Sequence, residues 1–281
     1  MSQSISLTGA MRANLLSLQN TVSLMNRTQD RLSTGKKVNS ALDNPTNYFA
    51  AKQHLNRASD ISARKDSMNE AIQTVKTASS GIESINTLID SAKGIAQAAL
   101  ATSDTTQRAQ YVTQYNAVIS QINTMASDSG YRGTNLLVSN TMTVKFNEDG
   151  ASSLSIEGFK ATATGLTVGI VGQASGGIST SWSDSTNGTL SINSALTQLS
   201  DAMSTLRVKA SALSASLSVV QTRADWADSM VATLQSGAGA LTDADMNEEG
   251  ANMLMLQTRQ SLGTTALSLS AQNAQSVLKL F

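Results

Sequence analysis

The longest hydrophobic pattern in this chain runs through residues 192–241. Apolar residues recur there at alternating steps of four and three, and neither glycine nor proline occurs between Leu190 and Ser236. The stripe consists of Ile192, Leu196, Leu199, Met203, Leu206, Ala210, Leu213, Leu217, Val220, Ala224, Ala227, Val231, Leu234, Ala238 and Leu241. Such a repeat places one apolar seam along a helix and requires partner helices along it. A helix over residues 192–234 would be about 65 Å long. The pattern therefore predicts an elongated rod, the alternative being a long buried helix of an ordinary bundle.

The N-terminal segment carries a heptad pattern of its own. Its stripe is Met11, Leu15, Leu18, Val22, Met25, Gln29 and Leu32. We expect this helix to end near Gly35, with Lys36 and Lys37 at its C-terminal end, where positive charge suits the helix dipole. A helix this short is marginal alone and needs a partner.

The middle of the chain predicts two further helices and a small β region. Residues 46–102 have helical spacing after the only proline, Pro45, and a second helix follows an expected N-cap at Ser103-Asp104. Residues 141–146 and 154–159 alternate and flank a turn sequence, which predicts a β-hairpin. Residues 172–188 are rich in Gly, Ser and Thr and are expected to form a surface loop.

The C-terminal segment, residues 247–281, again has helical spacing. Met255, Leu262 and Leu269 repeat at seven, and Leu267, Ala274 and Phe281 form a second set at seven. Because the chain runs out through long helices and returns, its two ends should lie together. The two terminal heptads are then each other's natural partners.

These patterns predict a mainly α fold: an elongated rod of long helices in coiled-coil packing, a small central β-hairpin region, and a terminal coiled coil of the N- and C-terminal helices. The expected division is a terminal helix over 1–35, a connector over 36–45, and the first half of the rod over 46–137. The hairpin and variable loop follow over 138–189, the long rod helix over 190–236, a connector over 237–246, and the second terminal helix over 247–281.

Composition removes several classes of function. The chain has 281 residues, 20 basic and 20 acidic, so its charge gives no long-range attraction to nucleic acid. It has no cysteine and one histidine, His54, which leaves no thiolate or histidine cluster for a metal and no thiol nucleophile. No residues suggest an active site or a cofactor site. No apolar run is long enough to span a membrane and no signal peptide is recognisable, so composition alone would indicate the cytoplasm.

Three segments carry a resemblance to a known family. Residues 31–44 read RLSTGKKVNSALDN, residues 131–137 read YRGTNLL, and residues 260–280 read QSLGTTALSLSAQNAQSVLKL. They resemble, in order, the N-terminal signature of bacterial flagellins, the segment that closes the N-terminal half of those proteins, and the flagellin C-terminus. The resemblance covers roughly residues 1–140 and 190–281. About fifty residues stand where longer flagellins carry outer domains, so we expect a short, minimal flagellin.

The resemblance implies a structural, non-enzymatic subunit that polymerises into the flagellar filament and serves motility. It also implies an extracellular location reached through the flagellar export apparatus without a cleaved signal peptide, contrary to what composition indicates. Implied partners are further copies of the chain, a flagellin chaperone, the filament cap and hook-junction proteins, with no nucleic acid and no membrane insertion. The alternatives are a flagellin-like hook–filament junction protein and a cytoplasmic coiled-coil scaffold.

The terminal stripes are the predicted polymerisation and coiled-coil interface. Its expected residues are Met11, Leu15, Leu18, Val22, Met25, Leu32, Met255, Leu262, Leu269, Val277, Leu278 and Phe281.

Overall fold

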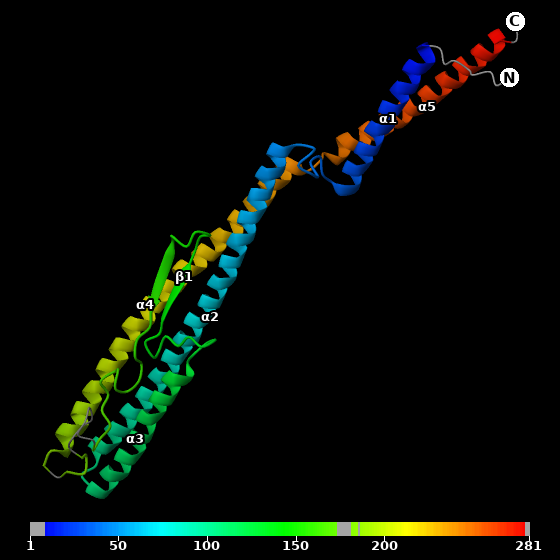
Figure 1. Ribbon diagram of the computed structural model, residues 1–281. Coiled ribbons are helices and arrows are strands. Elements are labelled where there is room, and N and C mark those ends of the chain that lie inside the picture. The colour runs from blue at the N-terminus through cyan, green and yellow to red at the C-terminus, as the bar shows by residue number, and fades with distance from the viewer. Residues whose placement is uncertain (1–8, 173–180, 185, 279–281) are drawn as a thin grey trace. The chain divides into compact units, whose positions relative to one another are not determined.

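The computed structural model describes residues 9–172, 181–184 and 186–278, and Figure 1 shows the chain. In these residues the fold is mainly α, with one small antiparallel sheet, as the sequence predicted. The elements are α1 (Gly9–Thr34), α2 (Pro45–Ala101), α3 (Thr105–Asp128), β1 (Thr141–Lys145), β2 (Ser153–Glu157), α4 (Gly188–Thr242) and α5 (Met246–Leu278).

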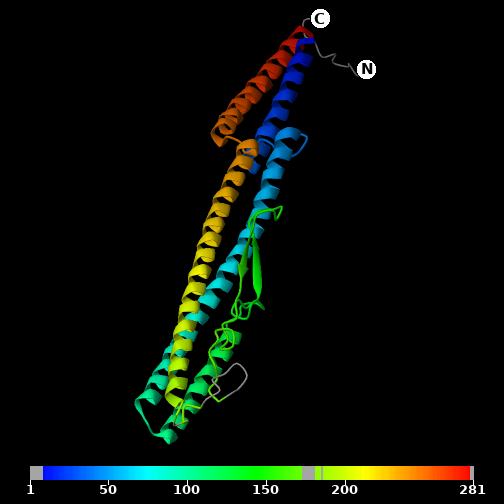
Figure 2. The ribbon, with the colours of Figure 1, turned by 90° about the vertical axis from the view of Figure 1, so that its left-hand side faces the viewer.

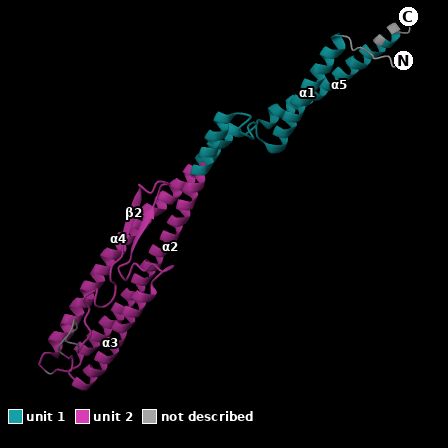
Figure 3. Cartoon of the chain, viewed as in Figure 1, with its two compact units in different colours: residues 1–57, 233–281 teal, residues 58–232 magenta. Residues whose placement is uncertain are grey.

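The chain divides into two compact units (Figure 3). The terminal unit contains residues 1–57 and 233–281, and the central unit contains residues 58–232. The two divisions between these units fall inside helices α2 and α4. The two backbone connections between the units therefore lie within helices, one in α2 and one in α4.

One hydrophobic core holds the central unit together. It joins buried side chains of α2, α3, the hairpin and α4, which run alongside one another in both views (Figures 1 and 2). No member of the predicted stripe of α4 is exposed; each is buried or half-buried. The seam read from the sequence is thus the face on which α4 packs.

The β-hairpin lies over this helical core. β1 pairs with β2 in antiparallel register, from Thr141 opposite Glu157 to Lys145 opposite Ser153. Val144 and Ile156 point inward and are nearly fully buried. Arg223 of α4 lies 5.3 Å from the ring centroid of Phe146, just after β1, so a cation–π contact helps to hold the hairpin on α4.

Local sequence signals explain the junctions of the central unit. Asp104 caps α3, because its carboxylate accepts hydrogen bonds from the amides of Thr106 at 2.8 Å and Gln107 at 3.4 Å. Gly81 sits where α2 meets Ser129 and Leu137, and a Cβ built there would overlap the Ser129 Oγ. Glycine at this point therefore permits a close approach.

Two expectations differ from the structure. The sequence predicted a connector over residues 237–246, but α4 continues to Thr242. Burial of Leu234 and Ala238 offsets the weak helix propensity of Gly237 and Gly239, which is about 1 kcal/mol each. Trp182 was placed in a surface loop, yet it is fully buried with its ring 4.8 Å from that of Tyr115. Part of that loop, residues 173–180 and 185, lies outside the described residues.

Candidate assembly interface

The terminal unit is built on an antiparallel pair of helices, α1 and α5. Helix α1 ends at a glycine in the left-handed region: Gly35 has φ +70°, and its amide donates to the Arg31 carbonyl at 2.8 Å. This end is where the sequence predicted it. The contacts Leu18 with Gly263 and Arg31 with Glu249 fix the register of the pair.

The two connectors bind each other through their backbones. The amides of Lys37 and Val38 both donate to the Thr242 carbonyl, at 2.7 and 3.1 Å, and the amide of Ala244 donates to the Gly35 carbonyl at 2.9 Å. These bonds join the end of α4 to the segment that follows α1. The chain that leaves the terminal unit and the chain that returns to it are thereby held side by side.

Asp43 stabilises the first connector from within. Its carboxylate accepts hydrogen bonds from the amides of Ser40 at 2.9 Å and Asn39 at 3.1 Å, and from the Ser40 hydroxyl at 3.1 Å. These donors, the Ser40 amide foremost, hold the pKa of Asp43 below its usual value. Asn44 then caps α2 by accepting from the amide of Asn47 at 3.1 Å.

A semi-buried ion pair joins the two terminal helices. The Arg31 guanidinium lies 2.7 Å from the Glu249 carboxylate, and the Glu249 side chain is only 8% exposed. Asp245 caps α5, because its carboxylate accepts from the amides of Asn247 and Glu248. The acidic residues at the start of α5 thus have separate roles: Asp245 caps the helix, and Glu249 pairs with the Arg31 guanidinium. Within the described chain no group of three or more His, Cys, Asp or Glu residues could hold a metal ion.

The seam of α1 is only partly the one predicted. Met11 and Thr28 are buried, and Leu18, Val22, Met25 and Leu32 are half-buried. Leu15 is 38% exposed and lies outside the seam. A threonine therefore occupies a central position that the hydrophobic pattern assigned to its exposed neighbour, Gln29.

The seam of α5 leaves out the first expected set at seven and includes Leu267 of the second. Its buried and half-buried positions follow alternating steps of four and three: Glu249, Met253, Leu256, Gln260, Gly263, Leu267 and Ser270. Met255, Leu262 and Leu269 are 47%, 66% and 59% exposed and face away from α1. The α5 side of the seam thus combines the apolar residues Met253, Leu256 and Leu267 with small and polar ones, while the apolar residues of the repeat at seven point outward.

Seven exposed apolar residues of α1 and α5 are together called the outer terminal face. It consists of Leu15, Leu16, Leu24, Leu254, Met255, Leu262 and Leu269. Exposed apolar residues in such number on two short helices indicate a surface that another molecule covers. Of the other predicted interface residues, Phe281 and the side chains of Val277 and Leu278 lie outside what the structure describes. That the predicted residues form an interface between subunits stays a prediction.

Comparison with known proteins identifies the family. A family model described as the bacterial flagellin N-terminal helical region matches residues 5–142. A flagellin of Brucella melitensis is 30% identical over 272 residues, which cover 95% of this chain and 95% of that protein. The chain belongs to the bacterial flagellin family. Flagellin FljO of Caulobacter vibrioides is 29% identical over 273 residues, again with 95% of each chain covered. A crystal structure of Bacillus cereus flagellin matches 57% of this chain and 88% of that one, with a TM-score of 0.47 and 15% identity.

Family membership gives this flagellin a structural role in the flagellar filament, which lies outside the cell. The N-terminal segment that carries the family resemblance includes Arg31, Gly35 and Asp43, the residues that respectively pair with α5, end α1 and order the connector. None of the helices described here has the length and apolarity of a membrane span.

Proposed function

We propose that this flagellin polymerises with itself into a flagellar filament that serves motility, and that subunits assemble through the outer terminal face. The observation that carries the proposal is the division of α5 into two faces. Met253, Leu256 and Leu267 pack against α1 together with small and polar residues, whereas Leu254, Met255, Leu262 and Leu269 remain exposed. Burial of these side chains on assembly would contribute about 1.5–3 kcal/mol each.

The route to the filament is part of the same proposal. The subunit passes through the flagellar export apparatus without a cleaved signal peptide, with a flagellin chaperone as a partner beforehand. It is added under the filament cap, beyond the hook-junction proteins. The resemblance of both ends of the chain to flagellins supports this route, and the lack of cysteine suits a chain that must travel unfolded. The alternative role, a hook–filament junction protein, would not give long filaments of this chain alone.

Electron microscopy of the purified protein, seeded with filament fragments, tests the proposal. We expect long helical filaments from the unmodified chain and a critical concentration raised at least about tenfold by Leu262→Asn, because that side chain would no longer be apolar at the contact. Gln257→Asn is the matched control, since Gln257 is an exposed polar residue on the same helix. No filaments from the unmodified chain would contradict the proposed function; equal assembly of both variants would contradict the assigned surface.

A further inference from the structure

Asn187 is the only asparagine of the sequence that is followed by a glycine, Gly188. This pair is the one most prone to deamidation in proteins, because glycine has no side chain to shield its amide nitrogen and adopts backbone angles that other residues resist. That nitrogen can attack the asparagine side chain and close a five-membered ring. The reactivity of Asn187 therefore depends on whether the fold leaves the Gly188 amide free.

The fold holds this pair in a hydrogen-bonded turn that leads into α4, here called the 184–188 turn. The Gly188 amide donates to the Asp184 carbonyl at 3.0 Å, and the Ser191 amide donates to the Asn187 carbonyl at 3.0 Å. Both bonds join residues four apart, as in an α-helix. The Asp184 carboxylate also caps the turn, because it accepts from the amides of Thr186 at 2.9 Å and Asn187 at 2.7 Å. The attacking nitrogen is thus engaged as a donor, and the backbone of Asn187 is fixed.

Packing explains why a glycine follows Asn187. Gly188 is buried, and a Cβ built there would overlap the carbonyl oxygen of Trp182. Trp182 is itself fully buried against the ring of Tyr115, so it has no room to withdraw. The Asn187 residue is exposed to water. The chain therefore keeps a chemically labile pair at a point where no larger residue than glycine fits.

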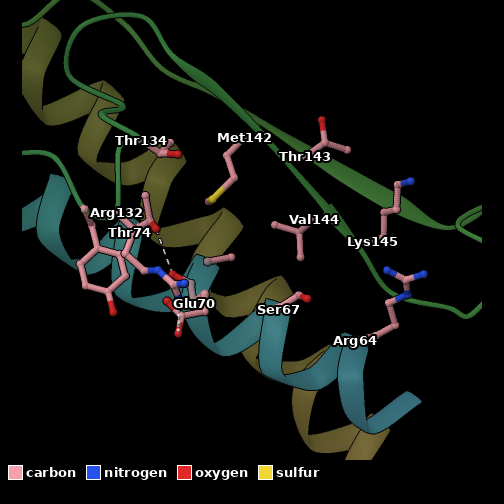
Figure 4. Close-up of a pocket in the computed structure, with 12 residues that line it drawn as sticks. Arg64, Ser67, Glu70, Thr74, Arg132, Thr134, Met142, Thr143, Val144 and Lys145 are labelled. Carbon is pink, nitrogen blue, oxygen red and sulfur yellow. Dashed lines mark hydrogen bonds and ion pairs between the residues drawn. The ribbon is translucent and has the colours of Figure 1, made fainter. Parts of the chain in front are cut away.

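A turn elsewhere in the central unit gives the opposite case. Tyr131 and Thr134 exchange two backbone hydrogen bonds of 2.9 Å, and between them Arg132 and Gly133 have φ of +46° and +82°. Positive φ at both central positions is typical of a type I′ turn, which favours asparagine followed by glycine. Arginine occupies the asparagine position instead, and its guanidinium lies 2.9 Å from the Glu70 carboxylate (Figure 4). Among the described residues the Gly133 amide has no hydrogen-bond acceptor, so an asparagine before it would be unprotected.

We propose that Asn187 is a deamidation site that the folded chain protects and that reacts when the 184–188 turn opens. In the open turn the Gly188 amide nitrogen bonds to the side-chain carbonyl carbon of Asn187. The bond from that carbon to Nδ2 breaks, and ammonia leaves with the proton that the amide has lost. Water then opens the ring at either carbonyl, which gives aspartate or isoaspartate.

The isoaspartate product would damage the start of α4. It adds a methylene group to the main chain, so the bond from the Gly188 amide to the Asp184 carbonyl cannot re-form in helical register. A chain kept unfolded before assembly, as the proposed export route requires, would accumulate this product, whereas a folded subunit would not. The inference goes beyond the proposed function and does not depend on it.

Peptide mass spectrometry of the full chain tests the protection, because it detects the exchange of the Asn187 amide for an acid. In mildly alkaline buffer the reaction should be at least about tenfold slower in the folded chain than in urea, since it requires a bonded turn to open. Asp184→Ala should raise the rate in the folded chain about fivefold by removing a helix cap, whereas Asp184→Ser keeps a capping oxygen and should leave the rate nearly unchanged. Equal rates in folded and unfolded chains, or in the two variants, would overturn the proposal.

Arg132→Asn supplies a matched control within the same molecule. It places an asparagine before Gly133 in the type I′ turn, and it removes only an exposed ion pair, which contributes little to stability. In the folded variant, deamidation at position 132 should be about tenfold faster than at Asn187, because the Gly133 amide is not held by a bonded turn. Equal rates at both positions would show that the 184–188 turn is not what protects Asn187, and would overturn the proposal.

The chemistry is tested in urea, where packing plays no part. Gly188→Ala should lose most of the reaction at Asn187 there, because a methyl group shields the attacking nitrogen. An unfolded chain that keeps Asn187 intact, or that reacts equally fast with alanine at position 188, would contradict the proposal. All of these measurements use monomers, so their outcomes leave the proposed role in a filament standing.

Discussion

The two units of this flagellin distribute apolar residues in opposite ways. The central unit buries its large side chains, among them Met68, Ile85, Tyr115 and Trp182, at 2% exposure or less. In the terminal unit, the α1–α5 seam holds Thr28, Gln260 and Gly263 beside apolar residues such as Leu18 and Leu256, while several other leucines of the two helices remain exposed.

This contrast separates two uses of an apolar residue. The central unit has a core large enough to fold within one chain, whereas the terminal pair leaves large apolar side chains exposed, and these form the surface proposed to meet other subunits. The terminal pair should therefore be the less stable unit in a monomer, and its ordering should be coupled to assembly.

A proline substitution in the central unit should have the largest effect on stability. Leu213→Pro removes a hydrogen bond from the middle of α4 and causes a clash with the preceding turn, at a cost of about 3 kcal/mol or more, and it interrupts the buried seam. We expect loss of the main cooperative melting transition in circular dichroism. Thr265→Pro, on an exposed position of α5, is the control and should leave that transition in place. A normal melt of Leu213→Pro would show that α4 does not hold the central unit together.

Removal of residues 252–281 should abolish polymerisation and leave the central unit folded. The deletion takes away most of α5, including Leu254, Leu262 and Leu269 of the outer terminal face. Seeded elongation measured by electron microscopy should be absent, while the main melting temperature should stay close to that of the full chain. Elongation at the normal rate would mean that the terminal helices do not hold subunits together.

Substitution of one glycine in each unit should change the unfolding free energy by a smaller amount. A Cβ at Gly81 would meet Ser129 and Leu137 in the packed central unit, and relief of that overlap should cost about 1–3 kcal/mol of unfolding free energy in Gly81→Ala. At Gly263 the Cβ would meet only the end of the flexible Leu18 side chain, at 2.8 Å.

Gly263→Ala should therefore be neutral or stabilising, because alanine gains about 1 kcal/mol of helix propensity over glycine. Thermal melting of both variants checks the difference. A larger loss for Gly263→Ala than for Gly81→Ala would show that the terminal pair is packed as tightly as the central core.

Acid should affect the first connector through Asp43. Since hydrogen bonds lower the pKa of Asp43 in the folded chain, its contribution to stability is present above the usual aspartate pKa of about 3.9 and is lost as the pH falls through the lower folded value. We expect the amide signals of Asn39 and Ser40 to shift in NMR spectra only under those acidic conditions. Asp43→Asn should remove that transition.

Asp184 supplies the control in the central unit, because its carboxylate accepts from the amides of Asn187 and Thr186, which lower its pKa in the same way. Its own transition should persist in Asp43→Asn. A connector transition that survives the substitution would assign the pH dependence to another group.

The fold was largely readable from the sequence because one strong signal dominates it. The stripe from Ile192 to Leu241 consists of residues whose burial outweighs other preferences, so the packed face of α4 could be predicted. The extent of that helix could not, since Gly237 and Gly239 normally indicate an end. Trp182 lies in a segment without hydrophobic periodicity, so no sequence pattern predicted its burial.

The interface was harder to predict because its strongest apolar signal lies outside the helix pair. Met255, Leu262 and Leu269 repeat at seven and were expected to meet α1. The structure instead places Gly263 against Leu18, where a missing side chain allows close approach, and Glu249 against Arg31. A search for hydrophobic periodicity cannot detect seam positions that are occupied by glycine, glutamine or an ion pair.

The burial of Trp182 has a consequence for spectroscopy. Both tryptophans, Trp182 and Trp226, belong to the central unit, and none occurs in residues 1–57 or 233–281. Tryptophan fluorescence, selectively excited, therefore reports the central unit alone: the shielded indole of Trp182 should emit at shorter wavelength than the partly hydrated Trp226. Heating a monomer while recording emission and far-ultraviolet dichroism together would separate the two halves of the molecule, because unwinding of α1 and α5 changes the dichroism and leaves the emission unaltered.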